Sequence, residues 1–128
     1  MASAACYDAL MSVNYSDERQ EMVEAIRTIA HHLAGEIGKP TLDDRILRAM
    51  AKVPREEFVP VEVKPYAYLN RPLPIGFDKT ISQPLIVAVM TDLLEPQPDD
   101  VVLEVGTGLG YQTATSRTSW QGVQRRDN

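Results

Sequence analysis

Cysteine and histidine are scarce in this sequence. Its 128 residues contain one cysteine, Cys6, and two histidines. A single cysteine excludes an internal disulfide, and nothing else points to an oxidising compartment. Protein metal sites usually take three or four ligands, and His31 and His32 are the only imidazoles, so we predict no metal site.

Excess positive charge and long apolar runs are also missing. Asp and Glu (18) outnumber Lys and Arg (13), which gives a net charge of −5. This balance argues against nucleic-acid partners, which are bound largely through Lys and Arg, and against a polybasic membrane surface. No stretch reaches the roughly 18 apolar residues that a membrane span needs, and residues 1–10 lack the basic start of a secretory signal. We therefore expect a cytoplasmic protein.

Three segments repeat apolar residues at helical spacing. The first ends at Gly38 and Pro40 and the second at Pro54, and Ser82 is well placed to cap the third. The expected buried faces are Met22, Ile26, Ile29, Leu33 and Ile37; then Ile46, Leu47, Met50 and Val53; then Ile86, Val89, Met90, Leu93 and Leu94. Residues 1–15 lack such periodicity, and we interpret them as a loose leader.

The segment from Pro54 to Pro74 contains five prolines, counting both ends. Proline lacks a backbone donor and disfavours helix at the preceding residue, so an extended, loop-like segment is expected here. Disorder is the alternative, but the segment carries more apolar and aromatic residues than disordered chains usually do. We predict an ordered loop that packs against the helices.

The sharpest local motif is Glu104-Val105-Gly106-Thr107-Gly108-Leu109-Gly110. It follows Val101–Val105, a β-branched apolar run of strand length. Glycines at alternate positions let the backbone approach a ligand closely, and an acid at a strand end suits an ammonium or hydroxyl group better than a phosphate. The spacing differs from the dinucleotide Gly-x-Gly-x-x-Gly, so the motif predicts a nucleotide-type ligand without saying which.

A second motif is Thr80-Ile81-Ser82-Gln83-Pro84. From composition alone, Ser82 is more often a helix cap than a functional group. No histidine lies nearby in sequence to activate it, and the Gly-x-Ser-x-Gly elbow of serine hydrolases is absent, so nothing supports a hydrolase.

Taken together, the two motifs resemble the bacterial protein-L-isoaspartate O-methyltransferase family. Supporting segments are Val53-Pro54-Arg55, Phe58-Val59-Pro60, Tyr66-Ala67-Tyr68 and Arg71-Pro72-Leu73-Pro74-Ile75-Gly76. The resemblance covers about residues 41 to 112. The glycine motif is shared by many S-adenosylmethionine (SAM) enzymes, whereas the Thr-Ile-Ser-Gln-Pro segment is much more specific.

The resemblance implies an α/β, Rossmann-like SAM-dependent methyltransferase fold with an N-terminal helical region. It also implies SAM as methyl donor and isoaspartyl-containing proteins and peptides as substrates, with the complete enzyme a monomer. By position, Ser82 matches the family's active-site serine. Cofactor-binding positions implied in the same way are Thr80, Ile81, Ser82, Glu104, Val105, Gly106 and Gly108.

The family's chain continues beyond the glycine loop through further helices and strands, whereas here a polar tail without an apolar stripe begins near Thr115. We therefore expect a fold truncated after its first strand and glycine loop. The expected divisions are a leader (1–15), a helical and loop region with the active-site segment (16–100), the start of the SAM-binding domain (101–114) and the tail (115–128). We expect this chain alone to be inactive or nearly so. The alternatives are a non-enzymatic fragment or interaction module and another SAM-dependent methyltransferase.

Overall fold

Helix α2 (Ser16–His32) is the longest element of the computed structural model, which describes residues 13–120. It buries Met22, Val23, Ile26 and Ala30 against α4 (Asp44–Lys52) and α5 (Pro84–Leu93). After a break at Leu33, the chain makes one more turn, α3 (Ala34–Ile37), which ends at Gly38 with a φ of 81°. The first predicted helix is thus confirmed, with an interruption near its end. Residues 1–12 of the predicted leader lie outside the described range.

Helix α4 begins at a side-chain cap. The Asp43 carboxylate accepts a hydrogen bond from the Arg45 N–H at 2.8 Å, and the Asp43 N–H donates to the buried Asp92 carboxylate of α5 at 2.7 Å. The start of α4 is therefore fixed to the end of α5. Its predicted apolar residues are buried in the common core, as the sequence indicated.

Helix α5 forms where it was predicted, but its buried face was predicted wrongly. The helix buries Leu85, Val87, Ala88, Thr91 and Asp92. Of the five expected core residues, Val89 is partly buried against the core, and the other four are exposed: Ile86 (42%), Met90 (53%), Leu93 (55%) and Leu94 (65%). The helix is apolar on both sides, and periodicity alone does not decide which side is covered.

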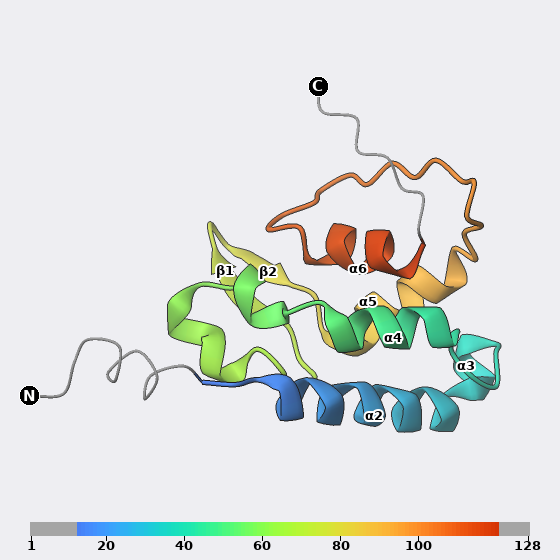
Figure 1. Ribbon diagram of the computed structural model, residues 1–128, viewed down its shortest axis with the longest axis horizontal. Helices are drawn as coiled ribbons and strands as arrows, with labels where there is room; N and C mark the ends of the chain where they lie inside the picture. The colour runs from blue at the N-terminus through green and yellow to red at the C-terminus, as the bar shows by residue number, and fades with distance from the viewer. Residues whose placement is uncertain (1–12, 121–128) are drawn as a thin grey trace, which may run out of the picture.

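The proline-containing segment packs against the helices, which confirms the ordered loop. It forms two 3₁₀ turns, η1 (Arg55–Phe58) and η2 (Val61–Tyr66), followed by strand β1 (Leu73–Gly76). β1 pairs antiparallel with β2 (Lys79–Ile81), in register Leu73↔Ile81 and Pro74↔Thr80. This hairpin leads directly into α5 and so places the Ser82 segment at the helix start (Figure 1).

The run Val101–Val105 forms no strand, so this prediction was wrong. Its side chains alternate in exposure: Val101, Leu103 and Val105 are 92, 86 and 88% exposed, and the residues between them are half-buried. A strand needs a neighbour for its backbone N–H and C=O groups, and within residues 13–120 the hairpin is the whole sheet structure. The parallel sheet of the expected Rossmann-like fold is therefore not present in this part of the chain.

Helix α6 (Tyr111–Ser119) follows the glycine loop although its sequence lacks an apolar stripe. It buries Tyr111, Thr115 and Ser119 and packs chiefly on α4, with Trp120 also buried. The start of the predicted polar tail is thus helical, and residues 121–128 lie outside the described range. Across residues 13–120 no helix is both long and apolar enough to cross a bilayer.

Candidate active site

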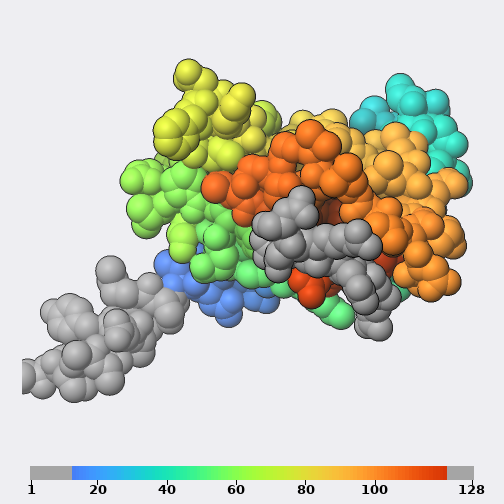
Figure 2. Space-filling model, turned by 90° about the horizontal axis from the view of Figure 1, so that it is seen from above, coloured from blue at the N-terminus to red at the C-terminus, as the bar shows by residue number. Residues whose placement is uncertain are grey.

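A small pocket lies where the hairpin, the start of α5 and the glycine loop meet. Its volume is about 90 Å³, well below the roughly 300–1,000 Å³ typical of complete ligand sites. In Figure 2 the orange glycine segment lies beside the yellow hairpin, so the two sequence motifs are neighbours in space. The lining residues are Ile75, Thr80, Ile81, Ser82, Val87, Glu104, Gly106, Thr107, Gly108, Leu109, Tyr111 and Gln112.

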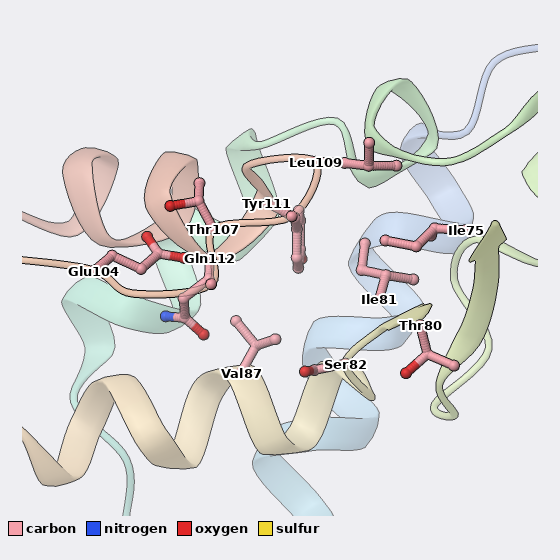
Figure 3. Close-up of a pocket in the computed structure, with 12 residues that line it drawn as sticks. Ile75, Thr80, Ile81, Ser82, Val87, Glu104, Thr107, Leu109, Tyr111 and Gln112 are labelled. Carbon is pink, nitrogen blue, oxygen red and sulfur yellow. The ribbon is translucent and has the colours of Figure 1, made fainter. Parts of the chain in front are cut away.

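Six of the seven site residues predicted from the sequence line this pocket. Thr80, Ile81 and Ser82 lie on one side of it and Glu104 on the other (Figure 3), and Gly106 and Gly108 also line it. Val105 is not among the lining residues and is 88% exposed. The pocket therefore joins residues that are more than twenty positions apart in the sequence.

Ser82 stands between β2 and α5 with an exposed side chain. The structural reading of Ser82 as a helix cap was wrong, because Gln83 occupies the cap position and no side chain caps α5. The backbone carbonyl of Ser82 accepts a hydrogen bond from Arg55 Nη2 at 2.8 Å. Arg55 therefore holds the Ser82 backbone through its carbonyl, and the Ser82 hydroxyl remains available to a ligand in the pocket.

The glycine loop has the backbone geometry that favours glycine. Gly106 and Gly108 have φ values of 78° and 59°, a region that residues with a Cβ rarely enter. A Cβ on Gly108 would lie 3.9 Å from Ile75 Cδ1, so the loop runs close to the hairpin. These glycines let the backbone form the wall of the pocket directly.

Glu104 supplies the only carboxylate in the pocket lining, which contains no lysine, arginine or histidine. Its Oε2 accepts a short hydrogen bond from the Thr113 hydroxyl of α6. With the hydroxyls of Thr80, Ser82 and Thr107, the lining offers acceptors and hydroxyls but no cationic group. Such a set suits an ammonium or hydroxyl group of a ligand and gives a phosphate no charged partner.

Tyr111 lies between the two sides of the pocket (Figure 3) and was not identified from the sequence. It is 2% exposed, and its ring packs edge-on against Phe58 with centroids 5.7 Å apart. Burial raises the pKa of its hydroxyl, while the nearby Arg55 guanidinium acts in the opposite direction. Because Tyr111 directly follows a glycine motif, only its position next to that motif could have drawn attention to it.

Gln112 is a second lining residue that sequence reasoning missed. Its amide nitrogen donates to the Thr91 hydroxyl of α5 at 2.6 Å and to the Ser116 hydroxyl at 3.2 Å. The start of α6 is thereby joined to α5 beside the pocket.

Comparison with known proteins identifies the relatives of this chain. Residues 28–123 match the family model described as protein-L-isoaspartate(D-aspartate) O-methyltransferase. The chain belongs to this family. The matched range extends beyond residues 41–112, in which the motifs of the resemblance lie, and includes α6.

Curated members of the protein-L-isoaspartate O-methyltransferase family are closely similar to the chain. Protein-L-isoaspartate O-methyltransferase 1 of Polaromonas sp. is 59% identical over 101 residues, which cover 79% of this chain and 43% of the relative. Protein-L-isoaspartate O-methyltransferase 2 of Syntrophobacter fumaroxidans is 56% identical over 100 residues, 78% of this chain and 40% of the relative. The protein of that name from Methanoculleus marisnigri is 55% identical over 98 residues, 76% of this chain and 40% of the relative. The chain therefore spans about two fifths of the length of these relatives.

Proposed function

We propose that this chain carries the substrate-side and glycine-loop part of a methyltransferase site, within a Rossmann-like domain. The reaction is methyl transfer from SAM to the α-carboxylate of L-isoaspartyl residues in damaged proteins, carried out in the cytoplasm by a monomer when the domain is complete. The observation that carries the proposal is the pocket in which the Ser82 segment faces Glu104 and the glycine loop. The family membership supports the same reaction.

The residues of the pocket fit the methionine part of SAM. The Glu104 carboxylate is an acceptor for an ammonium group, and the positive φ values of Gly106 and Gly108 let backbone approach a ligand without a Cβ between them. When bound, SAM supplies an electrophilic methyl group on a sulfonium. The small volume of the pocket supports the expectation that this chain alone holds only part of that molecule.

Ser82 has a role that requires no general base. The α-carboxyl group of an isoaspartyl residue has an ordinary pKa near 3.5, so it is already ionised at neutral pH. The Ser82 hydroxyl can donate a hydrogen bond to that carboxylate and orient one oxygen toward the methyl carbon. Alignment of reacting groups can contribute about 7–11 kcal/mol. The absence of a histidine from the lining is therefore compatible with the reaction.

A chimera tests this proposal. Residues 1–112 of this chain would be joined to the C-terminal remainder of the Polaromonas relative, and radiolabelled methyl transfer would be measured on an isoaspartyl peptide. The chimera should methylate this peptide and leave its aspartyl counterpart unmodified, whereas the 128-residue chain should show little or no turnover. A chimera that folds but methylates neither peptide, or both equally, contradicts the proposed function. Normal turnover by the 128-residue chain contradicts the expected inactivity.

Two variants of the chimera examine the role of Ser82. Ser82→Ala should lower kcat/KM by about 10- to 100-fold, the equivalent of one hydrogen bond to a charged group. Thr41→Ala removes an exposed hydroxyl that does not line the pocket and should leave kcat/KM unchanged. If kcat/KM is the same in both variants, Ser82 does not take part in the mechanism.

A non-enzymatic interaction module is the second candidate. It is favoured by the exposed apolar side chains of Met90, Leu93, Leu94, Leu103 and Val105. Calorimetry separates the two candidates, because a pure interaction module should show no heat of SAM binding.

A further inference from the structure

Arg55 is the largest fully buried side chain in residues 13–120, with 0% exposure. No carboxylate in this range lies within ion-pair distance of its guanidinium, and the buried Nη1 has no hydrogen-bond partner there. Burial lowers the pKa of the guanidinium, while Tyr111 and Tyr68 act in the opposite direction. A cation buried without an ion pair is costly, so a purely packing role would be served better by an apolar side chain.

The contacts of Arg55 join three separate segments around the pocket. Nε donates to the Ala67 carbonyl at 2.7 Å, and Nη2 donates to the Ser82 carbonyl at 2.8 Å. Cζ lies 4.7 Å from the centroid of the Tyr111 ring, at the end of the glycine loop. One planar group therefore holds both the Ser82 backbone and the first residue of α6.

These contacts depend on the shape of the guanidinium as well as on its charge. Arginine presents several N–H donors in a rigid plane that can also stack on an aromatic ring. Lysine has one mobile ammonium and cannot reproduce two directed hydrogen bonds and a ring contact together. Arg55→Lys therefore keeps the positive charge and removes the planar group that makes the two hydrogen bonds and the ring contact.

We propose that Arg55 is the positioning residue of this site: it fixes the Ser82 backbone relative to Tyr111 and thereby sets the distance between the Ser82 hydroxyl and the glycine loop. Arg55 does not line the pocket, so it acts through these two residues. The proposal rests on the proposed function for its consequence in catalysis. The mechanical link itself can be measured without any methyl transfer.

Amide hydrogen exchange in the 128-residue chain, followed by NMR, measures this link. Two reporters lie on the Ser82 side, the N–H groups of Leu85 and Val87, which donate to Asn70 Oδ1 and to the Gln83 carbonyl. Two lie on the glycine-loop side, the N–H groups of Gly110 and Ala114. Arg55→Lys should speed exchange at both pairs by about tenfold more than at the Gly38 N–H, a reference amide at the end of α3.

Arg19→Lys is the matched control. Arg19 also lies over a tyrosine ring, with Cζ 5.6 Å from the Tyr68 centroid, and also donates through its guanidinium, but its hydrogen-bond partners are Tyr68 and Glu56 and not the Ser82 backbone. Its substitution should change all the amides in parallel. Equal exchange at the four reporters in Arg55→Lys and Arg19→Lys, relative to Gly38, would overturn the proposal.

Ligand binding separates a positioning role from a purely structural one. Calorimetric titration of the chimera with S-adenosylhomocysteine should show affinity about tenfold weaker in Arg55→Lys than in the unsubstituted chimera, with Arg19→Lys unchanged. Unchanged affinity in folded Arg55→Lys overturns the positioning role even if exchange is faster. No binding by the unsubstituted chimera contradicts the cofactor proposal instead, and the exchange data still decide whether Arg55 links the two sides.

If Arg55→Lys does not fold, Tyr111→Leu tests the same link from the other end. It keeps both hydrogen bonds of Arg55 and removes the aromatic ring together with its hydroxyl. Exchange at Leu85 and Val87 should then accelerate although the change lies on the glycine-loop side. Unchanged exchange at these two amides would overturn the proposal.

Discussion

The Tyr68 hydroxyl is the centre of a hydrogen-bond network that joins the proline-containing segment to α2. It donates to the Glu56 carboxylate, accepts from Arg19 Nε at 2.8 Å and accepts from the Arg55 N–H at 3.1 Å. Arg19 and Glu56 also pair directly, at 3.0 Å. Tyr68→Phe removes one oxygen and with it three hydrogen bonds, while the ring remains in place.

The loss of unfolding free energy expected in Tyr68→Phe depends on the polar groups that this substitution leaves without a partner. A hydrogen bond to a charged group is worth about 1.5–3 kcal/mol, and an unsatisfied buried donor costs about 1–3 kcal/mol. Arg19 and Glu56 retain each other and are 16% and 11% exposed, so water replaces part of what they lose. We therefore expect a loss of about 2–4 kcal/mol in the free energy of unfolding, a large fraction of the roughly 5–15 kcal/mol of an ordinary domain.

Urea unfolding followed by circular dichroism measures this loss. Tyr66→Phe is the matched control, because Tyr66 is 48% exposed and its hydroxyl makes no hydrogen bond to the described residues. It should change the free energy of unfolding by less than about 0.5 kcal/mol. If the two variants unfold at the same urea concentration, the network does not stabilise the loop and the reasoning is refuted.

Three further predictions concern pH, the exposed apolar surface and a buried carboxylate. Burial and the hydrogen bond to Glu56 raise the pKa of Tyr68 above 10.0. Its neutral form therefore stabilises the fold fully below pH 10, and this stability is lost as the pH rises further; alkaline unfolding should show a weaker pH dependence in Tyr68→Phe. Leu103 is 86% exposed, so Leu103→Lys should reduce the fluorescence of a bound apolar dye and change the free energy of unfolding by less than about 0.5 kcal/mol. Asp92 pairs with Lys39 at 2.7 Å and has a fully buried side chain, so Asp92→Asn should cost about 2–3 kcal/mol in urea unfolding. Glu95→Gln, which removes the 70% exposed partner of the same lysine, should be nearly neutral, and equal losses would contradict the role of burial.

The residues that line the pocket were predictable where the local sequence is distinctive. The sequence by itself shows two such features: glycines at alternate positions, and a Ser-Gln-Pro segment before a helix. Residues of both segments line the pocket. Arg55 and Tyr111 carry no such local signal. Their importance comes from contacts with residues 12 to 56 positions away, which the sequence does not reveal.

The sequence alone determined where the helices α2, α4 and α5 lie, because a period of 3.6 residues and the prolines and glycines that end a helix are local properties. It also determined the family, through two motifs of specific residues. Tertiary structure decided which side of α5 is buried and whether Val101–Val105 forms a strand. Both depend on a partner surface: an apolar helix face is covered only where another element packs on it, and a strand exists only where a neighbour accepts its backbone hydrogen bonds.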